Sequence, residues 1–327
     1  MSERERFDEL ETALSAVFSG RDVPKDVGEE PRDLALLAGY LLGLPREEFR
    51  AALKADLVRP GGAPPETAAT EAAETAPEKS HSVTPYIVVR DAEGLMKFVG
   101  EAFGATELLR SSGSAGGFHG EVRIGDSKVM MGGFPGMSSP ERLATLHLYV
   151  SDADATYRRA LAAGATSLYA PMDQFYGDRE GGVRDPFGNR WFIATRRKGA
   201  PQMPEGRRSV TPFFIASNTA DWMDFLKSAL GAEELARVGP HGGDVRYAMM
   251  RIGDSVIEMG EAHGEHAAST PAMLYVIVDD VDASYTRAVA GGAHAVEAPK
   301  LQPYGARVGH VKDSRGNDWY LVTPVRA

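Results

Sequence analysis

The chain has 327 residues, a net charge of −10, 43% hydrophobic and 25% charged residues, and no cysteine. This length predicts two or three domains, and the composition is typical of a soluble globular protein. The acidic balance argues against binding to nucleic acid or to an anionic membrane surface. The lack of cysteine excludes disulfides, cysteine-ligated zinc and cysteine nucleophiles.

The first residues, MSERERFDEL, carry charges of both signs around no apolar core, which is not typical of a signal peptide. No stretch approaches the roughly 18 apolar residues that a membrane span needs. We therefore expect a cytoplasmic protein without a membrane partner.

Residues 1–58 have the periodicity of helices. RFDELETALSAVF has apolar residues at helical spacing, and DLALLAGYLLGL and PREEFRAALKADL follow it. Three such helices would form a small N-terminal segment with a marginal core, so we expect it to dock on something, a protein partner being one interpretation. Residues 59–81 are rich in Pro, Ala, Glu and Thr and predict a flexible linker.

From Ser82 onward the chain repeats itself. SVTPYIVV returns as SVTPFFIA, RIGDSKVMMG as RIGDSVIEMG, and YGDREGGVRDPFGNRW as YGARVGHVKDSRGNDW. The repeat predicts two tandem domains, over residues 82–197 and 209–326, joined by a linker over residues 198–208. Within each domain a strand-like run leads twice into an amphipathic helix and three short strands, so the chain contains four βαβββ modules.

This pattern resembles the vicinal oxygen chelate superfamily, which includes glyoxalase I, bleomycin-resistance proteins and extradiol dioxygenases. The strings RIGDS, LHLYV, DQFYGDR and DPFGNRW look most like its PhnB-like glyoxalase subgroup. The resemblance implies an α+β fold in which paired βαβββ modules form a cup, with the ligand on the concave face and the helices on the convex face. Two modules of one domain, or one module of each domain, could form such a cup, and the sequence leaves both arrangements open.

In metal-dependent members of this superfamily, His, Glu or Gln side chains on the first and fourth strands of two modules hold a divalent cation. Strand register places the equivalent positions at Thr84, Met130, Thr145, Phe192, Thr211, Glu258, Met273 and Tyr320. Only Glu258 is a ligand of the family's type, so we expect no cofactor, with a divalent metal as the alternative. A register error of two residues would move His147 onto the site but would still not supply three ligands.

Alternation along the strands places apolar and aromatic side chains on the faces that point into the cups. Walls of this kind suit a small organic molecule. The predicted binding residues on strands are Tyr86, Met130, Tyr149, Phe192, Phe213, Tyr275 and Tyr320. By the same rule Trp191 points away from the cup, toward a core covered by helices.

The stretch DQFYGDR and its partial copy QPYGAR add candidates at the mouth of the cup. These candidates are Phe175, Tyr176, Asp178, Arg179, Tyr304 and Arg307. The guanidinium of Arg179 could bind an anionic group of a ligand. The motifs DPFG and DSRG that follow are typical of hairpin turns.

Two histidines are candidate catalytic bases, because an unperturbed imidazole titrates near neutrality. His119 lies on the third predicted strand, and His147 lies in an apolar strand that faces the cup. The alternative interpretation of each is a structural histidine bonded to its neighbours. If a single cup is active, we expect it to be the one that contains His119, His147 and Asp178.

The sequence supports three functional hypotheses. The first is a glyoxalase- or bleomycin-resistance-like protein that binds a small organic molecule in aromatic-lined cups, with its metal ligands largely lost. The second is a divergent lyase or isomerase of the glyoxalase type, either metal-dependent or histidine-based. The third is a regulatory or interaction protein that uses the N-terminal helices. The oligomeric state stays open, a homo-oligomer included.

Overall fold

The computed structural model describes residues 81–112, 117–174, 176–199, 204–239, 245–261, 271–303 and 305–325, together with the single residues Thr12 and Pro24. The predicted N-terminal helices, their predicted partner and nearly all of the linker before the repeats therefore lie outside the described residues. No helix in the described part of the chain has the length and apolar character to cross a membrane.

The first domain contains two βαβββ modules, as the repeat predicts. Module 1 comprises β1 (Val83–Val88), α4 (Ala92–Phe103), β2 (Thr106–Ser112), β3 (Phe118–Ile124) and β4 (Ser127–Gly133). Module 2 comprises β5 (Thr145–Tyr149), α5 (Ala153–Ala162), β6 (Thr166–Asp173), β7 (Asp178–Arg184) and β8 (Arg190–Arg196).

The second domain repeats this order. Module 3 comprises β9 (Val210–Ala216), α6 (Thr219–Leu230), β10 (Glu233–Val238), β11 (Tyr247–Ile252) and β12 (Ser255–Glu261). Module 4 comprises β13 (Met273–Ile277), α7 (Val281–Ala290), β14 (His294–Leu301), β15 (Ala306–Lys312) and β16 (Asp318–Pro324). The α+β class and the tandem arrangement predicted from the sequence are confirmed.

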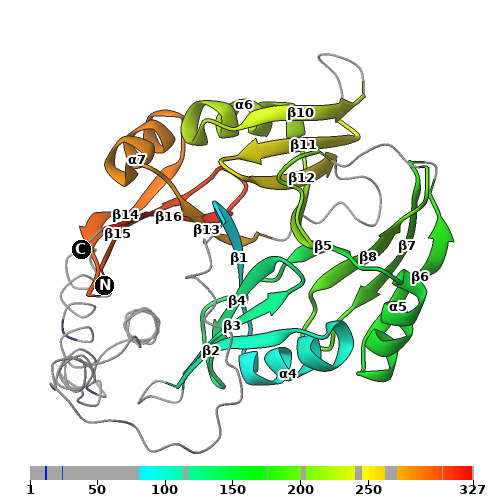
Figure 1. Cartoon of the computed structure of the whole chain (residues 1–327). Coiled ribbons are helices and arrows are strands. Elements are labelled where there is room, and N and C mark those ends of the chain that lie inside the picture. Colours follow the sequence, from blue (N-terminus) through cyan, green and yellow to red (C-terminus); the bar gives the residue numbers. More distant parts are fainter. Residues whose placement is uncertain are drawn as a thin grey trace, which may run out of the picture.

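Each sheet takes one module from each domain, which settles the question that the sequence left open. Modules 4 and 1 form an eight-stranded sheet in the order β14-β15-β16-β13-β1-β4-β3-β2. Modules 3 and 2 form a second sheet in the order β10-β11-β12-β9-β5-β8-β7-β6. The modules join through antiparallel pairs at the centre of each sheet, β1 with β13 and β5 with β9. Figure 1 shows that the two sheets curve and open in opposite directions.

The hydrophobic cores, unlike the sheets, belong to the domains. Helix α4 packs beside α5, and α6 packs beside α7. Trp191 lies in a core built from both modules of domain 1, and Trp222 and Trp319 lie in the equivalent core of domain 2. All three indoles are essentially inaccessible to solvent. The predicted orientation of Trp191, away from the cup, is confirmed.

Local sequence explains where the helices begin and end. The side chains of Asp91, Asp152 and Asp280 accept hydrogen bonds from the first turns of α4, α5 and α7, which satisfies backbone N–H groups that lack a helical partner. Gly104 ends α4 and Gly231 ends α6 with φ values of 71° and 65°. These left-handed conformations favour glycine, because a side chain there meets its own backbone.

The hairpins after β7 and β15 confirm the turn prediction and show why their sequences repeat. The buried carboxylate of Asp185 accepts hydrogen bonds from Asn189 and, at 3.0 Å, from the indole nitrogen of Trp191. The buried Asp313 makes the same contacts with Asn317 and Trp319. The DPFGN and DSRGN motifs therefore join the turn to the core, and their duplication reflects architecture.

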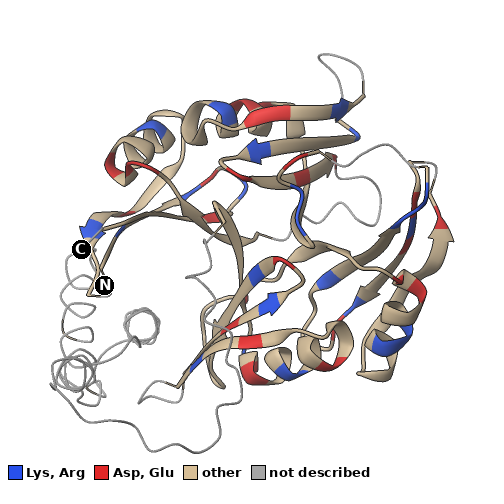
Figure 2. Cartoon of the chain, viewed as in Figure 1, with Lys and Arg blue, Asp and Glu red and all other residues tan. Residues whose placement is uncertain are grey.

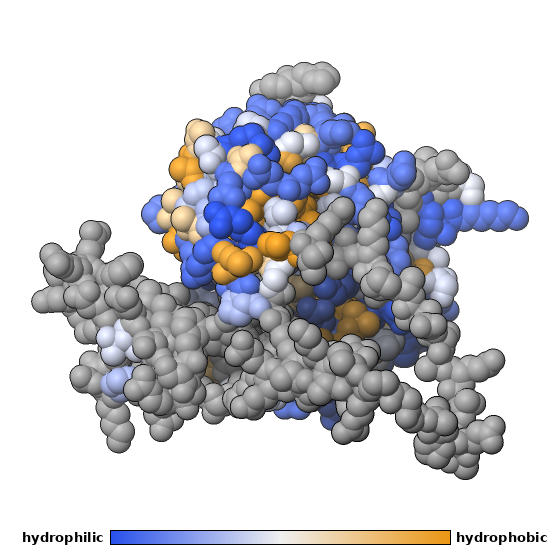
Figure 3. Space-filling model, turned by 60° about the vertical axis from the view of Figure 1, so that its left-hand side comes forward, coloured by the Kyte–Doolittle hydropathy of each residue, from blue (hydrophilic) through white to orange (hydrophobic). Residues whose placement is uncertain are grey.

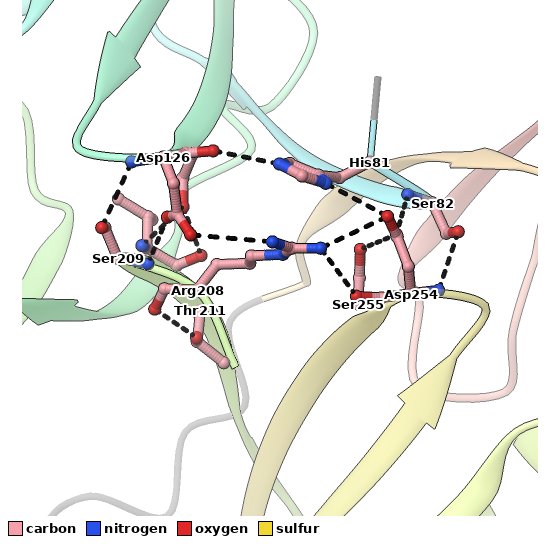
Figure 4. A network of polar contacts seen from close by, with 10 residues as sticks. His81, Ser82, Asp126, Arg208, Ser209, Thr211, Asp254 and Ser255 are labelled. Atoms are coloured by element: carbon pink, nitrogen blue, oxygen red, sulfur yellow. Dashed lines mark hydrogen bonds and ion pairs between the residues drawn. The ribbon is translucent and has the colours of Figure 1, made fainter. Parts of the chain in front are cut away.

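A polar junction explains the repeated RIGDS motif (Figure 4). Asp126, from the turn before β4, accepts a hydrogen bond of 2.7 Å from the backbone N–H of Ser209 in the other domain. Asp254 accepts one of 2.8 Å from the backbone N–H of Ser82. Arg208 forms ion pairs with both aspartates. Asp126 thus connects the module 1–module 4 sheet to the residue before β9 of the other sheet. Asp254 in turn connects the module 2–module 3 sheet to the residue before β1.

The surface of the described elements is mixed in charge and polarity. Figure 2 shows acidic and basic residues interspersed along the helices and strands. On the face shown in Figure 3, hydrophobic residues form small separate groups among hydrophilic ones. The exposed apolar side chains lie mainly on the outer strands β2, β6, β10 and β14, such as Leu108, Met172, Val238 and Leu301.

Candidate functional site

We call the face of the module 1–module 4 sheet that points away from the helices cup A, and the same face of the module 2–module 3 sheet cup B. Leu274 and Trp319 are buried in the core of domain 2, so their neighbours Tyr275 and Tyr320 face cup A. The aromatic and sulfur-containing side chains of cup A are Tyr86, Met130, Met273, Tyr275 and Tyr320. All of them except Met130 are partly exposed to solvent.

One wall of cup A carries a chain of polar contacts. The Tyr86 hydroxyl lies 3.0 Å from Nδ1 of His119, and the two rings stack at 5.6 Å. Nε2 of His119 lies 3.6 Å from Glu121, which also pairs with Lys128 at 3.1 Å. A Cβ atom at Gly132 would lie 2.5 Å from the Tyr86 hydroxyl, so this glycine makes room for the contact.

Burial and nearby charges determine the protonation states of Tyr86 and Glu121 on this wall. Burial raises the pKa of Tyr86 far above its ordinary value, so the phenol is neutral and can donate a hydrogen bond. Burial also raises the pKa of Glu121, but hydrogen bonds and charge from His119 and Lys128 outweigh it and leave that pKa lowered. Glu121 is therefore a carboxylate that can orient His119.

The opposite wall of cup A carries a second histidine. His310 stacks on Tyr320 with ring centres 4.2 Å apart and an interplanar angle of 12°. Its Nε2 lies 2.9 Å from Asp318, which also pairs with Arg142 at 2.6 Å. The two walls thus differ in residues but both combine a ring, an imidazole and a carboxylate.

Cup B is lined by more aromatic rings. Phe192 packs edge-to-face against Phe213 at 5.5 Å and lies 6.2 Å from both the Tyr169 ring and the His147 ring. Its aromatic side chains are Tyr149, Tyr169, Phe192, Phe213 and Tyr247. Gly182, opposite Phe192 in the sheet, leaves room for Tyr169, whose ring would lie 2.5 Å from an added Cβ.

A buried charge cluster lies at the centre of cup B. His147 reaches Glu258 of module 3 through Nδ1 at 2.9 Å and Glu180 through Nε2 at 2.7 Å. Glu180 also accepts hydrogen bonds from Tyr169 at 2.6 Å and from Tyr176 at 3.0 Å. Both nitrogens of the imidazole are therefore held by carboxylates, one from each domain.

These contacts set the charges of the cluster. Burial alone lowers the pKa of His147, but the charges and hydrogen bonds of Glu258 and Glu180 outweigh it and raise the pKa to about 9. Burial raises the pKa of Glu258, yet His147 and Arg207 leave it below its ordinary value, and His147 has the same effect on Glu180. At neutral pH His147 is an imidazolium between two carboxylates, so it has no free lone pair to act as a base.

Two arginines complete cup B. Arg207, from the segment between the domains, pairs with Glu258 at 2.5 Å, and its guanidinium lies 4.3 Å from the centre of the Tyr149 ring. Arg196 pairs with Asp178 at 2.7 Å, and Asp178 also accepts a hydrogen bond of 2.9 Å from the Tyr149 hydroxyl. The carboxylates of cup B thus pair with cations of the protein itself.

The structure places most predicted residues on the faces that alternation assigned to the cups. Those facing cup A are Tyr86, His119, Met130, Tyr275 and Tyr320, and those facing cup B are His147, Tyr149, Asp178, Phe192, Phe213 and Glu258. The prediction that His119, His147 and Asp178 share one cup is wrong, because His119 lies in cup A while His147 and Asp178 lie in cup B. Residues of one domain separate in this way because its two modules belong to different sheets.

Five further predicted residues concern the mouth of the cup. Arg179 binds Asp154 of α5 through Nε at 2.5 Å, and Arg307 binds Asp282 of α7 at 2.6 Å. Both arginines therefore point to the helix side, and the expected contact of Arg179 with a ligand in the cup is wrong. Along β7 and β15, Arg179 and Arg307 lie next to residues that face the cup, so their own side chains point to the other face of the sheet. Tyr176 is partly exposed beside Glu180, while Phe175 and Tyr304 lie outside the described residues.

Sequence reasoning missed several residues of the site. Glu180 follows Asp178 by two positions, so alternation along β7 would have found it had the strand been predicted to begin at Asp178. His310 of cup A and Tyr169 of cup B also lie on strands whose limits were not assigned. Arg207 lies in the predicted linker over residues 198–208, and no periodic signal points to it.

The sheet pairs the predicted ligand positions of the fourth strands with residues two places beyond the predicted positions of the first strands. His147, not Thr145, lies beside Phe192, and Phe213, not Thr211, lies beside Glu258. Alternation predicted the faces but not which residues pair across the strands, since its period is two.

The four paired residues on the first and fourth strands of each cup do not fit a divalent cation. In cup B they hold one imidazole, one carboxylate and two phenyl rings, and in cup A they hold Tyr86, Met130, Tyr275 and Tyr320. Among the described residues no group of three or more histidine, aspartate or glutamate side chains has a geometry that could hold a metal ion. The donor sets at these positions therefore fall short of what such a cation requires.

Comparisons with known proteins agree with the tandem fold. A family model described as "Glyoxalase/Bleomycin resistance protein/Dioxygenase superfamily" matches residues 79–193 and 210–321. An uncharacterized protein of Mycobacterium bovis is 40% identical over 123 residues, which cover 34% of this chain and 81% of that protein.

Solved structures share the fold at low sequence identity. Glyoxalase I from Zea mays has a TM-score of 0.57 and 15% identity, covering 74% of this chain and 91% of the maize chain. A putative dioxygenase from Bacillus subtilis has a TM-score of 0.52 and 12% identity, covering 75% of this chain and 85% of its own.

Proposed function

Because the chain belongs to the glyoxalase/bleomycin resistance protein/dioxygenase superfamily, we propose that it binds a small organic molecule and that the binding site is cup A. The observation that carries this proposal is a difference in exposure. The charged side chains of cup B that pair with His147 are 0–8% exposed, whereas His119 and Glu121 of cup A are 16% and 18% exposed. A ligand can reach the second set without breaking a buried ion pair.

The walls of cup A suit an apolar or aromatic ligand. Partly exposed rings of Tyr86, Tyr275 and Tyr320 offer flat surfaces, and Met130 and Met273 offer polarisable surface that adapts to shape. The Tyr86 hydroxyl and the imidazole of His119 supply polar contacts that would orient the ligand. Few directed polar groups among apolar walls are typical of sites for small organic molecules.

Binding of the apolar dye anilinonaphthalene sulfonate tests the location of the site. We expect Tyr275→Ala combined with Tyr320→Ala to weaken dye binding at least about tenfold, because the double variant removes two stacking surfaces. The matched cup B variant, Phe192→Ala combined with Phe213→Ala, should leave the affinity within about twofold. Loss of affinity in the cup B variant alone would overturn the assignment to cup A.

A second candidate function, proton transfer, is favoured by the Tyr86–His119–Glu121 arrangement. Glu121 orients one nitrogen of His119 and the other faces the hydroxyl of Tyr86, which is the constellation of a base with its orienting group. We propose this as the lyase or isomerase alternative, without a metal. The reaction would begin when the Tyr86 hydroxyl accepts a proton from the carbon next to a carbonyl group of the ligand and passes its own proton to Nδ1 of His119.

Exchange of such protons with deuterium oxide, followed by NMR over a panel of small carbonyl compounds, tests this alternative. We expect exchange to depend on His119 and to vanish in His119→Gln, while His310→Gln in the same cup retains it. Exchange that is equal in the two variants, or no faster than in buffer for every compound, would exclude His119 as a base.

A further inference from the structure

We propose that in cup B the guanidinium of Arg207 is the resident cation, occupying the place that a divalent metal has in metal-dependent members of the superfamily. The proposal concerns cup B alone and is independent of what cup A binds. Three observations support it: the path of the segment that delivers Arg207, the contacts of its guanidinium, and the residues at the remaining ligand positions.

The segment before β9 is held so that Arg207 enters the cup. The carbonyl of Gly206 accepts a hydrogen bond of 3.0 Å from the backbone N–H of Val256 on β12. Gly206 has a φ of 90°, and a Cβ there would lie 3.0 Å from the carbonyl oxygen of Asp254. Glycine is thus needed for this close, left-handed approach. The backbone contact fixes the start of the Arg207 side chain against the strand that carries Glu258.

The guanidinium then meets the Glu258 carboxylate, which is the group in this cup that attracts a cation. One of its terminal nitrogens lies 2.5 Å from Glu258 and 3.4 Å from Nδ1 of His147. Its plane lies over the Tyr149 ring at 4.3 Å. A planar, weakly hydrated cation tolerates burial against an aromatic ring better than a compact ion does. The Arg207 side chain is 7% exposed, so it is part of the interior of the cup.

The charges of the cluster balance without any further ion. His147 and Arg207 carry two positive charges, and Glu180 and Glu258 carry two negative charges. The guanidinium of Arg207 lies 2.5 Å from Glu258. A divalent cation bound to the same carboxylate would add two positive charges close to this guanidinium, which like-charge repulsion opposes. The guanidinium and the cation are therefore alternative occupants.

The residues paired with His147 and Glu258 in the sheet provide no donor for a metal. Phe192 and Phe213 lie beside His147 and Glu258 in the sheet, and their rings pack against each other at 5.5 Å. Phenyl rings cannot coordinate a divalent cation, but they provide the apolar surroundings in which a charge-assisted ion pair is strong. The paired phenyl rings and the buried Arg207–Glu258 ion pair therefore both fit a site held by a cation of the protein itself.

Arg207→Ala tests the proposal through chemical rescue of the full-length protein. We expect the variant to lose roughly 10 °C in unfolding temperature, since Glu258 loses its arginine partner in a buried site. Low millimolar guanidinium chloride should restore part of the loss, because the free ion refills the vacated place, while equal sodium chloride should not. Arg208→Ala, at the polar junction, is the matched control and should show no rescue specific to guanidinium.

Two further measurements keep the test decisive. If Arg207→Ala does not fold, the double variant Arg207→Met with Glu258→Gln removes both ends of the ion pair and should fold. For the wild type, dialysis against a chelator should leave the unfolding temperature unchanged, and added Mn²⁺, Ni²⁺ or Zn²⁺ should not raise it. A stoichiometric metal that is lost in Glu258→Gln but kept in Arg208→Ala, or an absence of guanidinium rescue in Arg207→Ala, would overturn the proposal.

Discussion

Cup A and cup B are built from equivalent strands, yet they differ in what fills them. In cup B a cluster around His147 is almost fully buried and neutralises itself, with Arg207 supplied by the segment between the domains. In cup A the side chains of His119, Glu121 and His310 are partly exposed on the walls, while Asp318 beside His310 is buried. The comparison teaches that two equivalent faces of one fold can differ in how deeply their charged groups are buried.

Removal of the Glu258 charge should produce the largest difference between the cups. Glu258→Gln leaves Arg207 and His147 buried without their shared carboxylate, which should cost about 3–5 kcal/mol of unfolding free energy. The matched variant in cup A, Glu121→Gln, affects a partly exposed pair and should cost about 1 kcal/mol or less. Urea unfolding of both variants provides the measurement, and equal losses would remove the distinction between a structural and an open cup.

The pH dependence of stability should report on cup B. His147 has a folded-state pKa of about 9 against 6.5 in its ordinary state, so the folded protein binds this proton more tightly than the unfolded chain. The resulting stabilisation is fully present below pH 6.5 and is lost as the pH rises through 9. Its size is on the order of 3 kcal/mol at most.

Urea unfolding at a series of pH values measures this loss. The groups that face His147 are Glu180, Glu258 and Arg207, and of these the two carboxylates cause the shift. His147→Gln should therefore flatten the profile between these pH values. A profile of unchanged steepness in the variant would show that His147 is not held as an imidazolium.

Gly132→Ala should disturb cup A specifically. The added methyl would lie 2.5 Å from the Tyr86 hydroxyl, so it should push the phenol away from His119 and cost about 1–2 kcal/mol through overpacking. In Gly100→Ala of α4 the new methyl would meet only the carbonyl oxygen of Ala105, at 3.9 Å, so this variant should stabilise the helix by roughly 0.5–1 kcal/mol. Dye affinity should fall in the first variant alone, and an unchanged affinity would argue that Tyr86 does not contact the ligand.

Substitutions in the polar junction between the sheets should lower the stability of the whole protein rather than that of one cup. Asp126→Asn and Asp254→Asn each weaken charge-assisted hydrogen bonds to a serine backbone N–H of the other domain, and each should cost about 1 kcal/mol. Thermal unfolding should give a somewhat larger shift for Asp254→Asn, because Asp254 also pairs with His81 at 3.2 Å. A loss confined to one of them would show that the two connections are not equivalent.

Arg179→Ala should have the smallest effect of all. Its guanidinium binds Asp154 and Asp173 on the helix side of the sheet, so dye binding to the protein should not change. Tyr320→Ala measured in parallel provides the positive control for loss of binding. Weaker binding in Arg179→Ala would return this residue to the mouth of the cup, where the sequence alone had placed it.

The repeat and the alternation of side chains gave the modules, the tandem domains and the faces that carry Tyr86, His147 and Phe192. They did not give the offset between neighbouring strands, because a shift of two residues preserves every face. They also missed Glu180, whose strand was expected to be a loop. The predicted role of Arg179 was wrong because this residue lies on the same strand, β7, where alternation turns its side chain toward α5.

The sequence by itself determined the four modules, the caps, the turns and the buried tryptophans, because these features depend on neighbours close along the chain. Tertiary structure alone decided that each cup joins a module of each domain. Strand edges pair through backbone groups that are the same in every module, so the choice of partner depends on how the cores and the junction pack. The same pairing separates His119 from His147 and brings Glu258 and Arg207 to His147, which no local pattern could predict.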